Sequence, residues 1–170
     1  MRKIVLTLIV MLAAMTADAQ KFALVDMEYI LKNIPAYERA NEQLNQVSKK
    51  WEGEVNSLLT EVETMYKKYQ SESVFLSDAQ KTKAEEAIMA KEKQASELKK
   101  KYFGSEGELF KKRQSLMSPI NDEIYSAVKA ISDQKGYQLI LDRASGGSII
   151  YASPKIDISD EVLMKLGYKY

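Results

Sequence analysis

The chain has 170 residues, with 25 basic and 24 acidic side chains and neither histidine nor cysteine. These two absences exclude Ser-His-Asp triads, cysteine nucleophiles, Cys/His zinc sites and disulfides, because each requires a residue type that the sequence lacks. We therefore expect no enzyme, no catalytic residue, no metal site and no cofactor, and a function that depends on binding surfaces.

The N-terminus has the three parts of a secretory signal peptide. Two basic residues precede an apolar run over residues 4–15, and Ala17-Asp18-Ala19 forms a small-x-small cleavage motif. A run of about 12 apolar residues is too short to cross a bilayer, which needs about 20. We expect cleavage after Ala19, which removes residues 1–19 and leaves a soluble chain outside the cytoplasm.

The mature chain is formally neutral. Loss of Arg2 and Lys3 reduces the 25 basic residues to 23, and loss of Asp18 reduces the 24 acidic residues to 23. Neutral charge and export both disfavour nucleic acid as a partner. No later segment is apolar enough to span a membrane, so we expect at most a weak association with a membrane surface.

A short strand, a helical turn and a long helix are predicted next. Residues 21–26, KFALVD, form a β-rich apolar run. The following MEYILKNIP predicts a turn of helix that ends at Asn33 and Ile34, since Pro35 disfavours helix in the residue before it and suits the start of a new one. From residue 36 to 72 a seam of apolar residues recurs at intervals of three and four, as in a coiled coil. The seam consists of Tyr37, Ala40, Leu44, Val47, Trp51, Val55, Leu58, Val62, Met65 and Tyr69.

A second long helix is predicted to return beside the first. Ser77 and Gln80 form a capping-box pattern that starts this helix at Asp78. Reflection of the chain near residue 75 brings Pro119 close to the level of Pro35, so we expect a kink there and a continuation to Lys135. The returning seam includes the polar residues Lys91, Ser105 and Lys112, which predicts loose packing.

Two glycines stand among bulky apolar residues inside this expected helix, in the stretch YFGSEGELF. In a helix interior Gly104 and Gly107 would each cost about 1 kcal/mol relative to alanine. We interpret them, with Pro35 and Pro119, as residues that give the helical hairpin its flexibility. Replacement of both glycines by alanine is therefore expected to stiffen the hairpin.

A second apolar ladder lies one residue away from the seam. It widens the apolar stripe beyond what one partner helix can bury. These side chains either pack at the root of the hairpin or against another subunit, or they form a binding surface, for which methionine and aromatic side chains are well suited. The ladder consists of Leu59, Tyr66, Met89, Phe103, Phe110 and Met117.

The C-terminal region predicts a small sheet. Gly136 ends the helix, and the β-rich runs 137–142 and 148–152 are joined by residues 143–147, a pattern typical of a hairpin. Three short strands leave open edges, so we expect an oligomer formed through the sheet. The residues assigned to this oligomerisation body are Phe22, Leu24, Val25, Leu139, Ile140, Leu141, Ile149 and Ile150. A final short helix, capped by Ser159, is expected to cover the sheet with Val162, Leu163 and Leu166 and to end at Gly167.

The mature chain resembles the Skp/OmpH family of periplasmic chaperones in the order of its short motifs: FALVD, YILKNIPAYERA, a long polar helical hairpin, GYQLILD, IIYA and DISDEVLMKLG. The resemblance implies a mainly α fold with a small three-stranded β part, arranged as a jellyfish-like homotrimer whose arms surround a cavity. Residues 36–118 would form the helical-hairpin arm, and residues 20–35 and 119–170 the oligomerisation body. Unfolded outer-membrane proteins would be held in the periplasm without ATP.

Two functions of different classes fit these observations. The first is a holdase that binds unfolded outer-membrane proteins and prevents their aggregation. The second is a coiled-coil scaffold or adaptor of the cell envelope that binds one folded partner. The scaffold predicts a regular, well-packed seam and no spare apolar ladder, so the polar seam positions and the two glycines favour the holdase.

Overall fold

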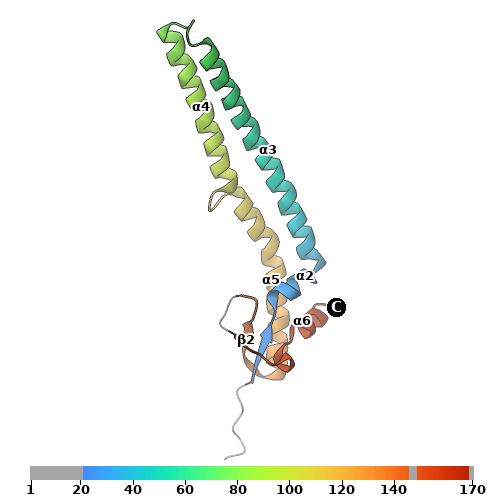
Figure 1. Cartoon of the computed structure of the whole chain (residues 1–170). Helices are drawn as coiled ribbons and strands as arrows, with labels where there is room; N and C mark the ends of the chain where they lie inside the picture. Colours follow the sequence, from blue (N-terminus) through green and yellow to red (C-terminus); the bar gives the residue numbers. More distant parts are fainter. Residues whose placement is uncertain (1–20, 146–148, 169–170) are drawn as a thin grey trace, which may run out of the picture. The chain divides into compact units, whose positions relative to one another are not determined.

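The computed structural model describes residues 21–145 and 149–168 (Figure 1). The predicted signal peptide and its cleavage site lie outside these residues. The chain divides into two compact units, Ile34–Asp122 and Met1–Asn33 with Glu123–Tyr170. We call the first the hairpin unit and the second the body unit.

The hairpin unit is built on two long helices, α3 and α4, which lie side by side (Figure 1). Helix α3 runs over Pro35–Glu72, with proline at its start, as predicted. Helix α4 runs over Asp78–Phe103, and the predicted capping box is confirmed: the hydroxyl of Ser77 accepts from the backbone N–H of Gln80, and the Gln80 side chain accepts from the backbone N–H of Ser77. A short turn over residues 73–77 therefore reverses the chain without leaving the start of α4 uncapped.

The second long helix is not continuous, which corrects the prediction made for its glycines. Helix α4 ends at Phe103, and α5 begins at Glu108 and runs to Lys135. A Cβ atom on Gly104 would lie 2.4 Å from the carbonyl oxygen of Lys100, and one on Gly107 would lie 2.7 Å from that of Tyr102. Both glycines are therefore required by close backbone contacts in a helix break. They do not lie in a helix interior.

Helix α5 continues through Pro119 and ends at Lys135, where the sequence predicted its end. Gly136 follows with φ of +71°, a left-handed conformation that glycine adopts without steric cost. The kink expected at Pro119 stays a prediction. Within the body unit, α5 presents a stripe of buried side chains at helical spacing, namely Ile124, Ala127 and Ile131.

The sheet of the body unit has two strands in the described residues, and they are parallel. Strand β1 covers Lys21–Val25 and β2 covers Tyr137–Asp142. Parallel strands need a long crossover, which the helices between residues 27 and 135 provide. In the register, Phe22 lies opposite Leu139 and Leu24 opposite Leu141.

The predicted third strand is wrong for the residues that the structure describes. Ile149, Ile150, Tyr151 and Ala152 lie in no strand, whereas Ser148 is outside the described range. The chain does not turn back along β2. It crosses to the other edge of β1, where the backbone N–H of Ile158 donates to the carbonyl of Leu24 at 2.9 Å. The predicted hairpin therefore has no ladder of its own in the single chain.

Three short helical segments complete the body unit: α2 (Met27–Lys32), the 3-10 turn η1 (Pro154–Ile156) and α6 (Ser159–Lys165). Helix α2 ends before Asn33, as predicted, and α6 packs against it with Val162 and Leu163 fully buried. The prediction that Ser159 caps α6 is wrong. Its hydroxyl donates to Asp157 and accepts from the backbone N–H of Asp26, so it links α6 to the end of β1.

Candidate functional site

The seam between α3 and α4 is better satisfied than its sequence suggests. Trp51 stacks on Tyr102 with ring centroids 4.6 Å apart and ring planes at 7°. The Tyr102 hydroxyl donates to Glu54 at 2.5 Å, and this hydrogen bond raises the pKa of Tyr102 above its usual value. The helices are thus joined firmly just before the break at Gly104. The fully buried seam residues of the two helices are Ala40, Leu44, Val55, Ile88 and Ala95.

Polar residues of the seam are paired across the two helices. Lys91 occupies a seam position and forms an ion pair with Glu61 at 2.8 Å. Nearer the turn, the Tyr69 hydroxyl donates to Glu85, and this bond raises the pKa of Tyr69. These side chains therefore find their partners within the hairpin unit, whereas the other two polar seam residues, Ser105 and Lys112, are exposed to solvent.

The spare apolar ladder is mostly exposed. Leu59, Tyr66 and Phe110 each keep about half of their surface in contact with solvent, and Met89 keeps 66%. Phe103 and Met117 are half-buried. Four of the six predicted binding residues therefore present apolar surface that the described hairpin unit leaves uncovered.

The helix break adds a recess to this surface. A hollow of about 210 Å³ is lined by Phe103, Leu109 and Phe110 together with Gly104, Ser105 and Arg113. Phe103 also makes an edge-to-face contact with Tyr102 at 6.3 Å between centroids. Phe103 at the end of α4 and Phe110 in α5 thus border one hollow, which forms where the helix is interrupted.

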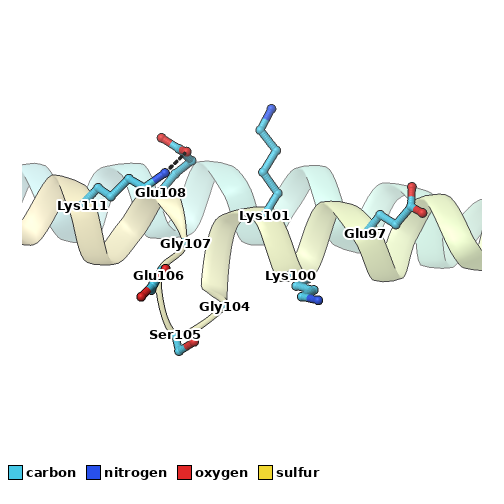
Figure 2. A pocket seen from close by; sticks show the side chains of 9 residues that line it. All are labelled: Glu97, Lys100, Lys101, Gly104, Ser105, Glu106, Gly107, Glu108 and Lys111. Atoms are coloured by element: carbon cyan, nitrogen blue, oxygen red, sulfur yellow. Dashed lines mark hydrogen bonds and ion pairs between the residues drawn. The ribbon is translucent and has the colours of Figure 1, made fainter.

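A second hollow at the break, of about 490 Å³, is lined mainly by charged side chains (Figure 2). Figure 2 shows Ser105 and Glu106 on the loop between the helices and the ion pair of Lys111 with Glu108, whose atoms lie 3.3 Å apart. Basic and acidic residues alternate around it, so the hollow has no strong preference for either sign of charge.

The body unit has one apolar face of its sheet open to solvent. Phe22, Leu139 and Leu141 are 53%, 51% and 43% exposed, and their register places them on the same face. Leu24 lies on this face too but is only 5% exposed, so the face is open in part. On the opposite face Ala23 and Val25 are buried. Ile150, from the segment that forms no strand in the described chain, is fully exposed. The predicted oligomerisation residues thus divide into a buried core and an uncovered apolar face.

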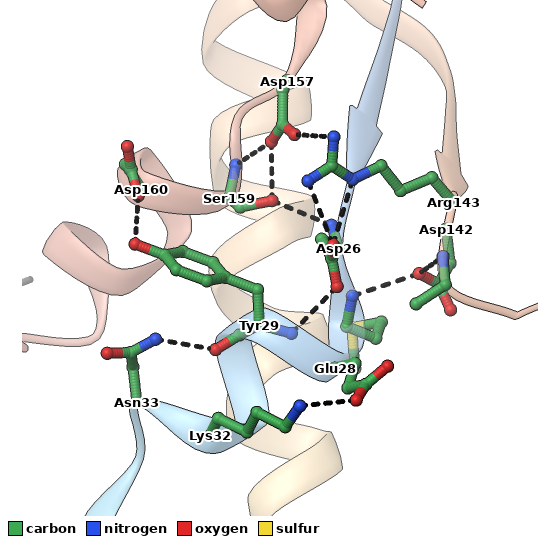
Figure 3. Close-up of polar contacts among 12 residues, drawn as sticks. Asp26, Glu28, Tyr29, Lys32, Asn33, Asp142, Arg143, Asp157, Ser159 and Asp160 are labelled. Atoms are coloured by element: carbon green, nitrogen blue, oxygen red, sulfur yellow. Dashed lines mark hydrogen bonds and ion pairs between the residues drawn. The ribbon is translucent and has the colours of Figure 1, made fainter. Parts of the chain in front are cut away.

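A polar cluster holds the ends of the body's segments together (Figure 3). The Arg143 guanidinium contacts Asp26 at 3.0 Å and Asp157 at 3.2 Å. Asp26 also accepts from the backbone N–H of Tyr29 and so caps α2; this hydrogen bond and the Arg143 pair lower the pKa of Asp26 despite its partial burial. On the neighbouring strand, Asp142 accepts from the backbone N–H of Met27 at 3.1 Å. The cluster fixes the segments that border the open sheet face.

Sequence reasoning missed one apolar feature, at the turn between α3 and α4. Val74 and Phe75 are 84% and 87% exposed. The sequence pattern predicts only that the chain reverses near residue 75. Two bulky apolar residues enclosed by serines in a loop, which is usually polar, were the available signal.

The described residues contain no helix that is both long and apolar enough to cross a membrane. Within the same ranges, no cluster of three or more acidic side chains is arranged to hold a metal ion.

Comparison with known proteins places these features in a family. Residues 21–166 match the family described as Outer membrane protein (OmpH-like). The Chaperone protein Skp of Yersinia enterocolitica is 25% identical over 156 residues, which cover 91% of this chain and 90% of that protein. The Chaperone protein Skp of Pectobacterium atrosepticum is also 25% identical, over 95% of this chain and 94% of its own length.

A solved structure supports the fold. The OmpH-like protein of Caulobacter crescentus CB15 has a TM-score of 0.68 with this chain at 14% identity, and the match covers 87% of this chain and 84% of that one. A mainly α fold with long helices and a small sheet is therefore shared. Since the family match extends over most of its length, the chain belongs to the OmpH-like outer membrane protein family.

Proposed function

We propose that this protein is a periplasmic holdase chaperone, which binds unfolded outer-membrane proteins without ATP and prevents their aggregation in transit. Two relatives of similar length bear the name Chaperone protein Skp, which supports the chaperone class. The predicted signal peptide supports export to the periplasm.

One observation carries the proposal: an exposed apolar ladder beside a satisfied seam. The hairpin unit pairs Lys91 and Tyr102 across its seam, yet leaves four apolar ladder residues exposed: Leu59, Tyr66, Met89 and Phe110. Monomeric soluble proteins rarely expose apolar side chains in a row, and such rows mark interaction sites. Methionine, leucine and aromatic side chains adapt to many apolar shapes, as an unfolded client requires.

Binding of this kind needs no chemical energy input. Each exposed side chain contributes a weak contact, and many such contacts together hold a disordered chain while each can still break rapidly. The client leaves when folding into the membrane offers a lower free energy. We assign the ladder and the recess beside Phe103 to client contact, and Gly104, Gly107, Pro35 and Pro119 to the adjustment of the hairpin to clients of different size.

We further propose that the functional form is a homotrimer assembled through the body unit. The open face of Phe22, Leu139 and Leu141 is apolar, and burial of such a face is the dominant favourable term in subunit association. The segment with Ile149 and Ile150 would then form its strand by pairing with a neighbouring subunit, which explains why it has no ladder within one chain.

The holdase is tested by dilution of a urea-unfolded outer-membrane barrel into buffer with and without the mature protein, followed by light scattering. The triple variant Leu59→Ser, Tyr66→Ser and Met89→Ser should require about tenfold more protein for half-maximal protection, because it removes three apolar contacts. The control Gln43→Ser, Gln70→Ser and Gln94→Ser changes exposed residues of the same helices and should protect like the parent. Unchanged aggregation at molar excess of the parent would contradict the holdase.

The stacked pair of Trp51 and Tyr102 favours the second candidate, a scaffold that binds a folded partner, since a firmly joined seam suits a rigid adaptor. The two functions differ in what they bind. A holdase binds several unrelated unfolded barrels and releases them once they fold, whereas a scaffold binds one folded protein and ignores urea-unfolded chains.

A further inference from the structure

We propose that the turn between α3 and α4 is a docking point for the surface of a zwitterionic phospholipid bilayer, with Val74 and Phe75 entering the interfacial region of the lipids. We call residues 73–77 the tip. The inference rests on the tip alone and does not depend on the holdase or on the trimer.

The tip presents its two apolar side chains outward in a defined conformation. The backbone N–H of Ser73 donates to the carbonyl of Tyr69 and that of Phe75 to the carbonyl of Glu72, both at 2.9 Å. The capping box fixes the other end at Ser77. The turn is thus formed before any partner arrives, so docking costs little conformational entropy.

Leu76 shows that apolar residues of this turn can pack inward. It is half-buried and lines a hollow between the helices together with Met65 and Ile88. Val74 and Phe75 instead leave more than four-fifths of their surface in solvent. Leu76 therefore packs against the two helices, whereas Val74 and Phe75 point into solvent.

The size of the pair excludes a stable protein interface and suits a lipid surface. A valine and a phenylalanine together offer about 300 Å² of surface, whereas a stable protein complex buries about 800 Å² on each partner. Shallow insertion into a bilayer requires only a few apolar side chains at a protruding point, because the lipid surface adapts to their shape.

Two serine hydroxyls near the pair already form hydrogen bonds, which lowers the cost of their approach to lipid. The hydroxyl of Ser71 donates to the carbonyl of Lys68 at 2.8 Å, and that of Ser73 to the carbonyl of Gln70 at 3.2 Å. Groups that form hydrogen bonds within their own helix lose little when water leaves.

The charges around the tip favour a lipid without net charge. Residues 67–86 contain four lysines and four acidic residues, so the tip region is neutral. For a neutral region, the attraction of its lysines to an anionic surface is offset by the repulsion of its carboxylates. Binding therefore depends on insertion of the apolar pair.

The test is flotation of the mature full-length protein with phosphatidylcholine vesicles, in parallel with vesicles that also contain phosphatidylglycerol. The double variant Val74→Ser and Phe75→Ser should bind phosphatidylcholine about tenfold more weakly, whereas the matched variant Met164→Ser, at an exposed apolar residue of α6, should change binding less than about twofold. Both substitutions fall on exposed side chains, and circular dichroism checks that the helices are retained.

A fluorescent label locates the contact. The chain has no cysteine, so Ser71→Cys and Ser96→Cys each give a single site for an environment-sensitive dye. The label at position 71 should brighten and shift to shorter wavelength on addition of phosphatidylcholine vesicles, and the label at position 96 should not. Equal binding by the parent and the tip variant overturns the proposal. So does binding that needs phosphatidylglycerol, or a tip variant whose only defect is in protection of an unfolded barrel.

Discussion

The hairpin unit and the body unit differ in how far their polar and apolar side chains find partners within the same unit. In the hairpin unit, side chains of the seam form polar contacts across the two helices, as Lys91 does with Glu61 and Tyr102 with Glu54. In the body unit a sheet face remains open, and Ile150 has its whole surface in solvent. The two helices thus cover part of each other's surface, whereas the described body unit leaves part of its sheet uncovered.

The reason lies in where the hydrogen bonds are made. A helix satisfies its backbone within its own segment, so two helices can pair through side chains alone. A strand satisfies its backbone only through a neighbour, and in the described chain the outer edge of β1 is met by a single bridge at Asp157, whereas the outer edge of β2 has no paired strand. Under the proposed function, exposed apolar residues therefore have different roles in the two units: client contact on the hairpin unit, and subunit association on the body unit.

The largest expected effect separates these meanings by charge substitution. Leu139→Asp with Leu141→Asp places two carboxylates on the open sheet face and should convert the assembled protein to monomers in sedimentation velocity, because a buried unpaired charge opposes association. Leu59→Asp with Met89→Asp puts the same charges on the hairpin and should leave the assembly intact. Loss of assembly in both double variants would contradict the division of roles.

The next effect concerns the helix break. Gly104→Ala with Gly107→Ala introduces methyl groups into close backbone contacts and should lower the free energy of unfolding by about 2 kcal/mol or more, since overpacking forces the backbone to shift. The structure thus reverses the stiffening that the sequence predicts. Urea denaturation followed by circular dichroism measures the change.

Gly53 provides the matched control for the break. It lies inside α3, and apart from the backbone of its own helix no atom of the described residues comes within 4 Å of a Cβ built on it. Gly53→Ala should therefore raise the free energy of unfolding by about 0.5–1 kcal/mol through helix propensity. Stabilisation by the alanines at positions 104 and 107 as well would show that the break is not required.

A smaller effect is expected at the stacked pair of Trp51 and Tyr102 in the seam. Trp51→Ala removes a half-buried aromatic side chain and should lower the free energy of unfolding by about 2 kcal/mol. Tyr102→Phe keeps the stack but removes the hydrogen bond to Glu54, so its effect should be smaller. The double variant, measured in the same urea titrations, should show less than the sum of the two, because both act on one contact.

Much of the helical architecture could be predicted from the sequence because its signals are local. Pro35 at the start of α3 and the capping box of Ser77 act over three or four residues, and both are confirmed. The seam does not predict the break at Gly104, because the seam residues on its two sides, Tyr102 and Leu109, remain seven positions apart, as in an unbroken helix.

The errors in the body have a different cause, since its contacts are distant in sequence. Serine is common at helix caps, but the hydroxyl of Ser159 accepts a hydrogen bond from the backbone N–H of Asp26, 133 residues away. The segment predicted as a third strand has a β-rich pattern, but in the described chain the bridge to the edge of β1 is formed by Asp157. Periodicity identifies a candidate strand, but it does not identify the partner of that strand.

The smallest expected effect tests the cluster that borders the open sheet face. The hydrogen bond from the backbone N–H of Tyr29 and the Arg143 contact favour the ionised form of Asp26 and hold its pKa below its usual range. A carboxyl with a depressed folded pKa contributes stability that is present above the unfolded value and lost as pH falls through the folded value. Stability should therefore decline on acidification from about pH 4 downward, by less than about 1 kcal/mol for this partly exposed pair.

Asp26→Asn removes the charge while keeping an oxygen that can cap α2, so its urea midpoint should depend less on pH than that of the parent in this window. The comparison is specific because Glu63, whose pKa is also lowered, forms a fully exposed ion pair with Lys67 on the hairpin unit. Glu63→Gln should change the same pH profile less, since solvent screens that pair. Equal changes in both variants would mean that the clustered contacts around Arg143 add nothing to an ordinary surface pair, and that the body's segment ends are held by packing alone.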